Sequence, residues 1–153
     1  MFRGSSPVTV DAKGRFAIPS AYRQPIRDAC GGRIVVTQHW DRCLLIYPQP
    51  QFQAFESELL SRGGLNPKVR DIQRFLLGNA RDLEMDKQGR LLLPSPLRGF
   101  AGIDSRAVLM GVGNLFELWA EDDWQARNDA SCDELAAQAA AGALPDALQD
   151  LPL

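Results

Sequence analysis

Short runs of apolar and β-branched residues alternate along the chain with residues that favour turns. They predict strands at 8–10, 15–18, 34–38, 43–47, 107–112 and 115–119. Asp11 and Gly14 separate the first two runs and favour a tight turn, so this segment is expected to form a hairpin. Turns at 40–42 and 113–114 separate the strands of the two later pairs. The fold class expected from this pattern is α+β and rich in strands.

Apolar positions at helical spacing predict helices between and after these strands. One helix is expected over 52–62, before a Gly-Gly pair that would end it, and a second over 68–78. Asn66 precedes the second helix as a cap, with proline at the first helical position. A third helix is expected over 121–141, where the sequence becomes rich in alanine.

An internal repeat organises these elements. Residues 10–20 (VDAKGRFAIPS) return as residues 85–95 (MDKQGRLLLPS), at a constant offset of 75 residues and without gaps. Arg23 and Arg98 also correspond. A duplicated unit is therefore expected, and the chain divides into a first repeat, a helical spacer, a second repeat, and a C-terminal helix with its tail, at 5–50, 51–79, 80–124 and 125–153.

A Pro-Ser step follows the second strand of each copy. The proline is expected to stop the strand, and Ser20 and Ser95 are expected to cap a short helix. Pro25 would lie beyond the first turn of the first of these helices, and Pro96 lies near the start of the second. The helix after Ser20 is therefore expected to be short or kinked.

Charge is divided unevenly along the chain. The 153 residues carry a net charge of −2, which argues against a general binder of polyanions. However, residues 1–82 hold 12 Lys/Arg and 7 Asp/Glu, whereas residues 83–153 hold 5 and 12. The first repeat and the spacer are thus basic, and the second repeat with the C-terminal helix is acidic.

Composition and cysteine usage bear on the compartment. Hydrophobic residues make up 45% of the chain, without an apolar run near the ~20 residues of a membrane span and without a signal peptide. Cys30, Cys43 and Cys132 are scattered and odd in number, unlike a disulfide framework. We expect a soluble cytoplasmic protein with no membrane partner.

Side chains suited to catalysis are scarce. His39 is the only histidine, and no serine or cysteine is placed for it to activate. The spacing of Cys30, His39 and Cys43 fits no usual zinc pattern. Gly111-Val112-Gly113 precedes a strand where a dinucleotide motif requires a helix. The sequence therefore predicts neither an enzyme nor a metal or cofactor site.

The repeated turn is the remaining candidate. Turn geometry alone explains Asp11, Gly14, Asp86 and Gly89, but it does not require the arginine that follows each glycine. Arg15 and Arg90, with Lys13 and Lys87 nearby, could present guanidinium groups to guanine or to phosphate oxygens. A surface salt bridge from each arginine to its turn aspartate explains the arginines equally well, and the residues alone leave both interpretations open.

The spacer offers a competing DNA-binding element. Its two helices could form a helix-turn-helix, with Lys68, Arg70 and Arg74 facing DNA. Both helices carry broad apolar stripes and lie outside the duplicated unit, so we favour a packing role for them.

Several motifs, taken in order, resemble one family. They are the start MFRG at 1–4, both Asp-x-x-Gly-Arg turns, both Pro-Ser steps, CLLIYP at 43–48, RFLLG at 74–78 and FELW at 116–119. Together they resemble the MraZ family, bacterial regulators of the division and cell-wall gene cluster. The resemblance extends over essentially the whole chain.

The resemblance implies two AbrB-like swapped-hairpin halves that form a pseudo-dimer within one chain. It also implies rings of about eight or more subunits, which bind G-rich direct repeats in the promoter of their own operon and mostly repress it. Such a protein would be associated with the nucleoid. The DNA-contacting candidates carried over to this chain are Arg3, Lys13, Arg15, Lys87 and Arg90, and we expect the basic first copy to dominate. The competing hypothesis is an oligomeric scaffold with no DNA target.

Overall fold

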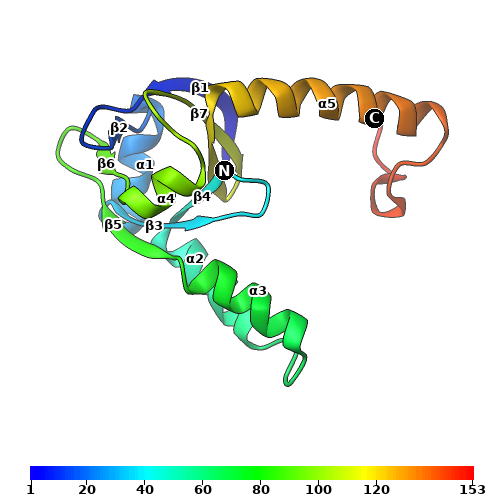
Figure 1. Ribbon diagram of the computed structural model, residues 1–153, viewed down its shortest axis with the longest axis horizontal. Helices are drawn as coiled ribbons and strands as arrows, with labels where there is room; N and C mark the ends of the chain where they lie inside the picture. The colour runs from blue at the N-terminus through cyan, green and yellow to red at the C-terminus, as the bar shows by residue number, and fades with distance from the viewer. The chain divides into compact units, whose positions relative to one another are not determined.

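The computed structural model describes all residues, Met1–Leu153, as two compact units, Met1–Glu121 and Asp122–Leu153. The strands are β1 (Phe2–Thr9), β2 (Arg15–Ala17), β3 (Arg33–Gln38), β4 (Leu44–Pro48), β5 (Arg81–Glu84), β6 (Arg90–Leu92), β7 (Arg106–Gly113) and β8 (Leu115–Ala120) (Figure 1). The helices are α1 (Ser20–Cys30), α2 (Gln49–Leu60), α3 (Pro67–Leu77), α4 (Ser95–Phe100) and α5 (Glu121–Ala140), with a 3-10 turn η1 (Asp146–Leu148). The α+β class is confirmed.

The strands of the two copies exchange partners. The six-stranded sheet has the order β1-β7-β8-β4-β3-β5, and β2 pairs with β6 in a second, two-stranded sheet. Strands β1 to β4 belong to the first copy and β5 to β8 to the second. If each strand is replaced by its counterpart in the other copy (β1 by β5, β3 by β7, β4 by β8), the sheet order stays the same, read in the opposite direction. The chain is therefore a pseudo-two-fold dimer of its own two halves, as the resemblance implies.

The two-stranded ribbon of β2 and β6 lies on the pseudo-two-fold axis. Phe16 pairs with Leu91, its own counterpart in the repeat, and this pair is flanked by Arg15 with Leu92 and by Ala17 with Arg90. The register is therefore symmetric about its central pair. This is the arrangement that brings the two copies of the repeated motif together.

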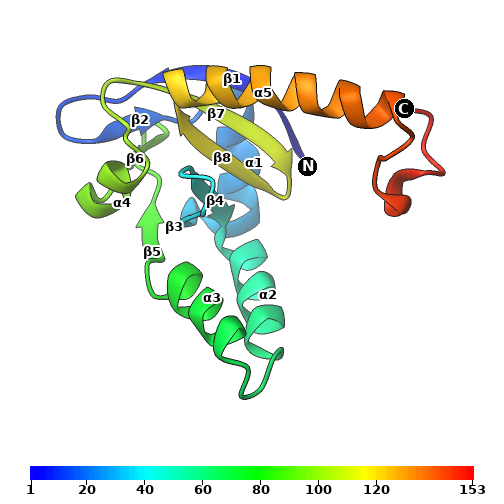
Figure 2. The same cartoon turned by 45° about the vertical axis from the view of Figure 1, so that its right-hand side comes forward.

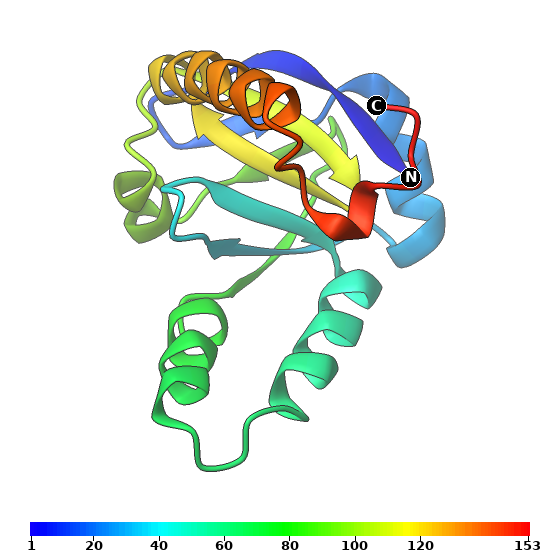
Figure 3. The ribbon, with the colours of Figure 1, turned by 90° about the vertical axis from the view of Figure 1, so that its right-hand side faces the viewer.

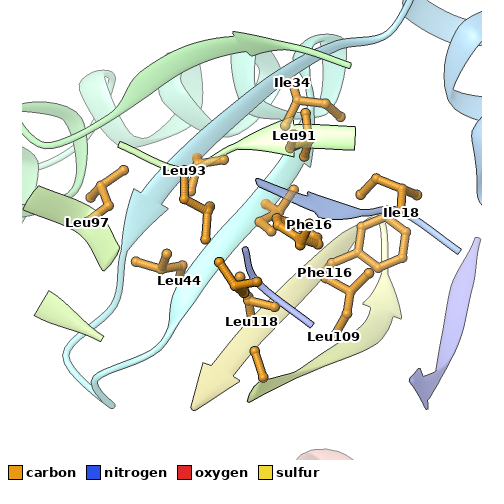
Figure 4. Packing of buried hydrophobic residues seen from close by; sticks show 14 of the residues in the cluster. Phe16, Ile18, Ile34, Leu44, Leu91, Leu93, Leu97, Leu109, Phe116 and Leu118 are labelled. Carbon is orange, nitrogen blue, oxygen red and sulfur yellow. The ribbon is translucent and has the colours of Figure 1, made fainter. Parts of the chain in front are cut away.

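The ribbon closes one side of the core of unit 1. Phe16 and Leu91 are fully buried in a cluster with side chains from β7, β8, β4 and α4 (Figure 4). Ile26 of α1 belongs to the same cluster. Leu109, Phe116 and Leu118 come from the second copy and meet residues of the first within one cluster. The core is thus shared, so neither copy has a complete apolar interior without the other.

The expected hairpin over 8–18 is only partly correct. The turn forms, but its two strands do not form a ladder with each other: β1 pairs with β7 and β2 with β6. β1 also begins at Phe2 instead of residue 8, and eight of its residues pair with β7. Gly111 permits this close approach, because a Cβ there would lie 2.5 Å from the backbone nitrogen of Arg3.

The expectations for the helices after the Pro-Ser steps need correction. Pro19 and Pro94 are the N-cap residues, and the serines are the first helical residues, with no side-chain cap bond at either N-cap. The helix α1 runs for 11 residues through Pro25, so it is not short. Its apolar face, including Ile26, is buried in the shared core, and this burial offsets the hydrogen bond that the proline removes.

The spacer forms an antiparallel helical hairpin of α2 and α3 (Figure 3). Asn66 caps α3 as expected, since its side chain accepts a hydrogen bond from the Lys68 N–H at 3.0 Å. Gln73 of α3 donates to the Leu59 carbonyl of α2 at 3.1 Å. Antiparallel packing differs from the crossed helices of a helix-turn-helix.

Unit 2 consists of most of α5 and the tail that follows it. The expected helix over 121–141 is confirmed as α5, and the leucines of the tail, Leu148, Leu151 and Leu153, are exposed. No helix of the chain combines the length and apolar character needed to cross a bilayer.

Candidate nucleic-acid interface

The repeated motif forms two equivalent turns, turn 1 (residues 11–14) and turn 2 (residues 86–89). In turn 1 the Asp11 carboxylate oxygen Oδ1 accepts the backbone N–H groups of Lys13 and Arg15, each at 2.9 Å. The N–H of Gly14 donates to the Asp11 carbonyl at 3.0 Å, with Gly14 at a φ of 96°. This positive φ requires glycine in the turn.

Turn 2 repeats this geometry. Oδ1 of Asp86 accepts the N–H groups of Gln88 and Arg90 at 3.0 and 2.8 Å, and Gly89 has a φ of 79°. Loops carrying the two turns lie on the same left-hand side of Figure 1, blue for turn 1 and green for turn 2. Asp86 and Gly89 therefore hold in turn 2 the positions that Asp11 and Gly14 hold in turn 1.

Each turn aspartate also holds the arginine that follows it. The Nε of Arg15 donates to Oδ2 of Asp11 at 3.0 Å, and the Nε of Arg90 donates to Oδ2 of Asp86 at 2.9 Å. The arginine side chains are 32% and 35% exposed. The salt bridge that the sequence left open is thus present, but it occupies only Nε and fixes the direction of the guanidinium.

The terminal nitrogens of the two arginines differ. Nη2 of Arg90 donates to the Gln88 side-chain oxygen at 2.8 Å, whereas Asp11 is the only hydrogen-bond partner of the Arg15 side chain. The outer edge of the Arg15 guanidinium therefore keeps both terminal nitrogens for an external acceptor. The arginine of turn 1 therefore has more nitrogens free to bind an external acceptor than the arginine of turn 2.

The ribbon puts both arginines on one face. Side chains alternate along a strand, and Phe16 and Leu91 point into the core, so Arg15, Ala17, Arg90 and Leu92 point outward. The register leaves the two arginines two pairs apart, which corresponds to about 7 Å along the strands. Two guanidinium groups thus share one exposed face of a rigid ribbon.

Hydrogen bonds across the ribbon lock each turn to the opposite copy. The N–H of Leu93 donates to the Gly14 carbonyl at 2.9 Å, and the N–H of Ile18 donates to the Gly89 carbonyl at 2.8 Å. Arg27 adds a brace to turn 2 alone, with Nη2 donating to the carbonyls of Asp86 and Lys87 at 2.9 and 3.1 Å. The sequence could not indicate Arg27, since no arginine stands at the equivalent position in the second copy.

The other predicted contact residues are placed less equally. Lys13 and Lys87 are exposed within the turns themselves. Arg3 is exposed near the opposite end of β1, about 20 Å along the strand from the turn, and its carbonyl accepts a hydrogen bond from Tyr22. The structure therefore places Arg15 and Arg90 two pairs apart on the ribbon, with Lys13 and Lys87 in the turns at its two ends, and leaves Arg3 apart from them.

The remaining sequence candidates form no competing site. His39 lies in the β3–β4 turn, where its Nδ1 accepts the Asp41 N–H at 3.1 Å. No three potential metal ligands gather anywhere in the chain. In α3, Arg74 is tied to Asp71 at 3.1 Å, which reduces the basic face that a helix-turn-helix would need.

Charge is also divided unevenly between the two structural units. Unit 1 holds 16 Lys/Arg and 12 Asp/Glu, a net charge of +4, and unit 2 holds 1 and 7, a net charge of −6. The weak net charge of the chain is therefore an average of a basic unit with the two turns and an acidic C-terminal unit.

Both turn aspartates are stabilised as anions. The backbone N–H of Arg15 is the main cause that lowers the pKa of Asp11 below its ordinary 3.8, opposed by partial desolvation and aided by the Arg15 side chain. The Arg90 N–H lowers the pKa of Asp86 in the same way. The two carboxylates therefore remain charged at neutral pH and hold the turns.

This depressed pKa predicts a dependence of stability on pH. The folded-state pKa of each aspartate lies below its unfolded value. The contribution of the two carboxylates to the free energy of unfolding is therefore complete above pH 3.8 and is lost as pH falls through the lower folded-state pKa values. Urea unfolding of the wild type and of Asp11→Asn/Asp86→Asn should show a gap in the free energy of unfolding that is constant above about pH 5 and shrinks below pH 4. A gap that does not change with pH would contradict this role, and Asp104→Asn controls for loss of an acidic charge.

Comparison with known proteins places this fold and motif in a family. The family model described as "MraZ protein, putative antitoxin-like" matches twice, at residues 1–75 and 76–144. A protein of Thioalkalivibrio sulfidiphilus, named transcriptional regulator MraZ, is 50% identical over 84% of this chain and 86% of its own length. A protein of Pseudomonas aeruginosa with the same name is 46% identical over the full length of both chains.

These relatives are named as regulators and not as enzymes, in agreement with the expectation from the sequence. Another relative of that name, from Methylococcus capsulatus, is 47% identical over 81% of this chain. The two matches to the family model together span both copies of the repeat. The chain therefore belongs to the MraZ family.

Proposed function

We propose that this protein is a sequence-specific DNA-binding transcriptional regulator. The observation that carries the proposal is the pair of arginines, Arg15 and Arg90, on one exposed face of a ribbon that both copies build. The names of the relatives support the same function. In this proposal residues 5–50 and 80–124 are the two DNA-binding repeats, 51–79 is a spacer, and 125–153 is a helix with a tail.

The chemistry of the arginine pair suits base recognition. A guanidinium whose Nε is already held by a carboxylate presents its terminal nitrogens in a fixed direction, as bidentate contact with O6 and N7 of guanine requires. Holding the side chain before binding also lowers the entropy lost on binding. The targets proposed are G-rich boxes, with Lys13 and Lys87 placed for the flanking phosphates.

Oligomerisation completes the mechanism. One bidentate contact discriminates by only about 1–3 kcal/mol, too little for one chain of weak net charge to select a promoter. A ring of about eight or more chains facing direct repeats would raise the affinity through effective concentration. We propose that this assembly represses the protein's own division and cell-wall operon, acting in the cytoplasm at the nucleoid.

The alternative is an oligomeric scaffold without a DNA target. One observation favours it: each arginine already pairs with an aspartate of its own turn. Both bridges leave terminal nitrogens on the exposed face, whereas a purely structural bridge has no use for two such groups side by side. We therefore favour DNA binding.

A fluorescence-anisotropy titration at two salt concentrations separates the two functions. The wild type should bind the DNA upstream of its own gene more tightly than scrambled DNA, and its affinity should fall steeply as salt rises, because bound phosphates release counterions. Equal and weak binding of both DNAs, with an oligomer that is indifferent to salt, would instead support the scaffold.

A further inference from the structure

A hollow of about 440 Å³ lies beside turn 1, between that turn, β6 and the start of α4. Figure 2 shows the backbone of β6 and α4 on the same side of the molecule as the blue loop that carries turn 1. We call it the turn-1 hollow. Two cationic side chains and a hydroxyl line it, and its floor is apolar. The residues that matter here are Lys13, Arg98, Ser95, Leu83, Leu92 and Pro94.

Two arginines lie at the pseudo-symmetric position beside turn 2. Arg23, the counterpart of Arg98, packs so tightly on Gly89 that a Cβ there would lie 2.3 Å from its Cδ. Arg27 covers the same turn by donating to the carbonyls of Asp86 and Lys87. The two turns therefore share a backbone geometry but differ in what lies beside them.

The difference has a cause in the second copy. Gly102 stands where the repeat would place a counterpart of Arg27, and α4 ends at Phe100. Arg98 is also drawn away from turn 1, because its Nε and Nη2 donate to the carbonyls of Ile103 and Asp104 at 3.1 and 2.9 Å. Its Nη1 lies 3.6 Å from the position of a Cβ on Gly14, an ordinary contact distance, whereas its counterpart Arg23 comes within 2.3 Å of the same position on Gly89.

The charges around the turn-1 hollow favour an anion. No carboxylate lines it. Asp11, the nearest acid in sequence, has both oxygens engaged by Lys13 and Arg15. Since side chains alternate along β5, Leu83 faces the hollow and its acidic neighbours on that strand face the other way. No carboxylate that lines this space therefore neutralises the positive charges of Lys13 and Arg98.

We propose that the turn-1 hollow binds a backbone phosphate of DNA, next to the base that Arg15 contacts. Lys13 and Arg98 supply positive charge, the Ser95 hydroxyl donates a hydrogen bond, and the apolar floor contacts the deoxyribose. This inference rests on the proposed function and adds that the two turns are unequal: turn 1 takes a phosphate in the hollow at its side, whereas Arg23 and Arg27 occupy that position at turn 2, where Lys87 alone is left to contact a flanking phosphate.

The pseudo-symmetry provides a matched pair of variants. Ser95→Asp puts a negative charge at the mouth of the hollow, and Ser20→Asp makes the same change at the equivalent position of α1. Both serines are exposed first residues of their helices, where an acidic side chain is well tolerated. The two variants should therefore have equal thermal stability, oligomeric state and net charge.

Ser95→Asp should weaken the binding of promoter DNA about tenfold more than Ser20→Asp. It should weaken the binding of scrambled DNA by a similar factor, because a phosphate contact carries no sequence information. It should also reduce the magnitude of the slope of log K against log salt by about 1. Isothermal titration with inorganic phosphate provides a second arm, in which no tight site is expected in either variant.

Equal losses of DNA affinity in Ser95→Asp and Ser20→Asp would overturn the inference. If the wild type still prefers its own promoter, the proposed function stands in that case. Tight binding of inorganic phosphate by Ser20→Asp but not Ser95→Asp, with equal DNA affinities, would assign the hollow to a free phosphate and also overturn it. A wild type without preference for promoter DNA would contradict the proposed function itself.

Discussion

Replacing Arg15 with alanine should reduce promoter binding by more than about 100-fold, to the level of scrambled DNA. The side chain offers two terminal nitrogens on the exposed face of the ribbon, and one bidentate contact with guanine accounts for about 5- to 150-fold in discrimination. Each chain of the proposed ring would lose its contact at once, so the losses multiply. Fluorescence anisotropy with the upstream DNA measures the effect.

The variant should keep its fold and its assembly. The main stabilisation of Asp11 comes from the backbone N–H of residue 15, which alanine retains. Size-exclusion chromatography with light scattering should give the same mass as the wild type. Arg90→Ala should reduce promoter affinity less than Arg15→Ala, because part of the Arg90 guanidinium is already bound to Gln88.

A matched control tests the spacer at the same time. Arg70 is an exposed arginine of α3, and Arg70→Ala removes the same charge from unit 1. Its promoter affinity should stay within about threefold of the wild type, as expected for a change in general charge alone. A large loss in Arg70→Ala, with little effect of Arg15→Ala, would assign DNA binding to the helical hairpin.

The second large effect concerns stability. Leu91 and Leu92 are neighbours on β6, but Leu91 is 0% exposed in the shared core and Leu92 is 53% exposed on the outer face. Leu91→Ala should lower the free energy of unfolding by about 2–5 kcal/mol, and Leu92→Ala by less than about 1 kcal/mol. Urea unfolding at one protein concentration measures both.

Because both copies share one core, the Leu91 variant should unfold in a single transition at lower urea. Two separate transitions would mean that the copies fold independently and would contradict the shared core. Similar losses for the two leucines would contradict the inward and outward alternation on which the placement of the arginines depends.

Much of this arrangement could be predicted from the repeat. The recurrence of Asp, Gly and Arg at fixed spacing indicated both turns, because the carboxylate and the positive φ are local requirements that each copy must satisfy alone. The helix over 68–78 was also predictable, since Asn66 and Pro67 are local signals. Local signals of this kind do not depend on which strand lies next to them.

Strand pairing could not be predicted in the same way. The polar residues Ser5 and Ser6 give β1 a weak pattern, and it is a strand because it pairs with β7 over its whole length. The serines after Pro19 and Pro94 were expected to cap, yet the prolines take that position. The roles of Arg27 and of the turn-1 hollow depend on contacts between the copies, which no short pattern contains.

The central claim is that Arg15 reads guanine, and a double-mutant cycle tests it most directly. Promoter DNA with 7-deazaguanine lacks the N7 acceptor that a bidentate arginine contact uses. Titrated against the wild type, this DNA should bind about tenfold more weakly than the natural promoter. Titrated against Arg15→Ala, the two DNAs should bind equally, since the contact is already absent. An equal penalty in the wild type and in the variant would contradict the claim.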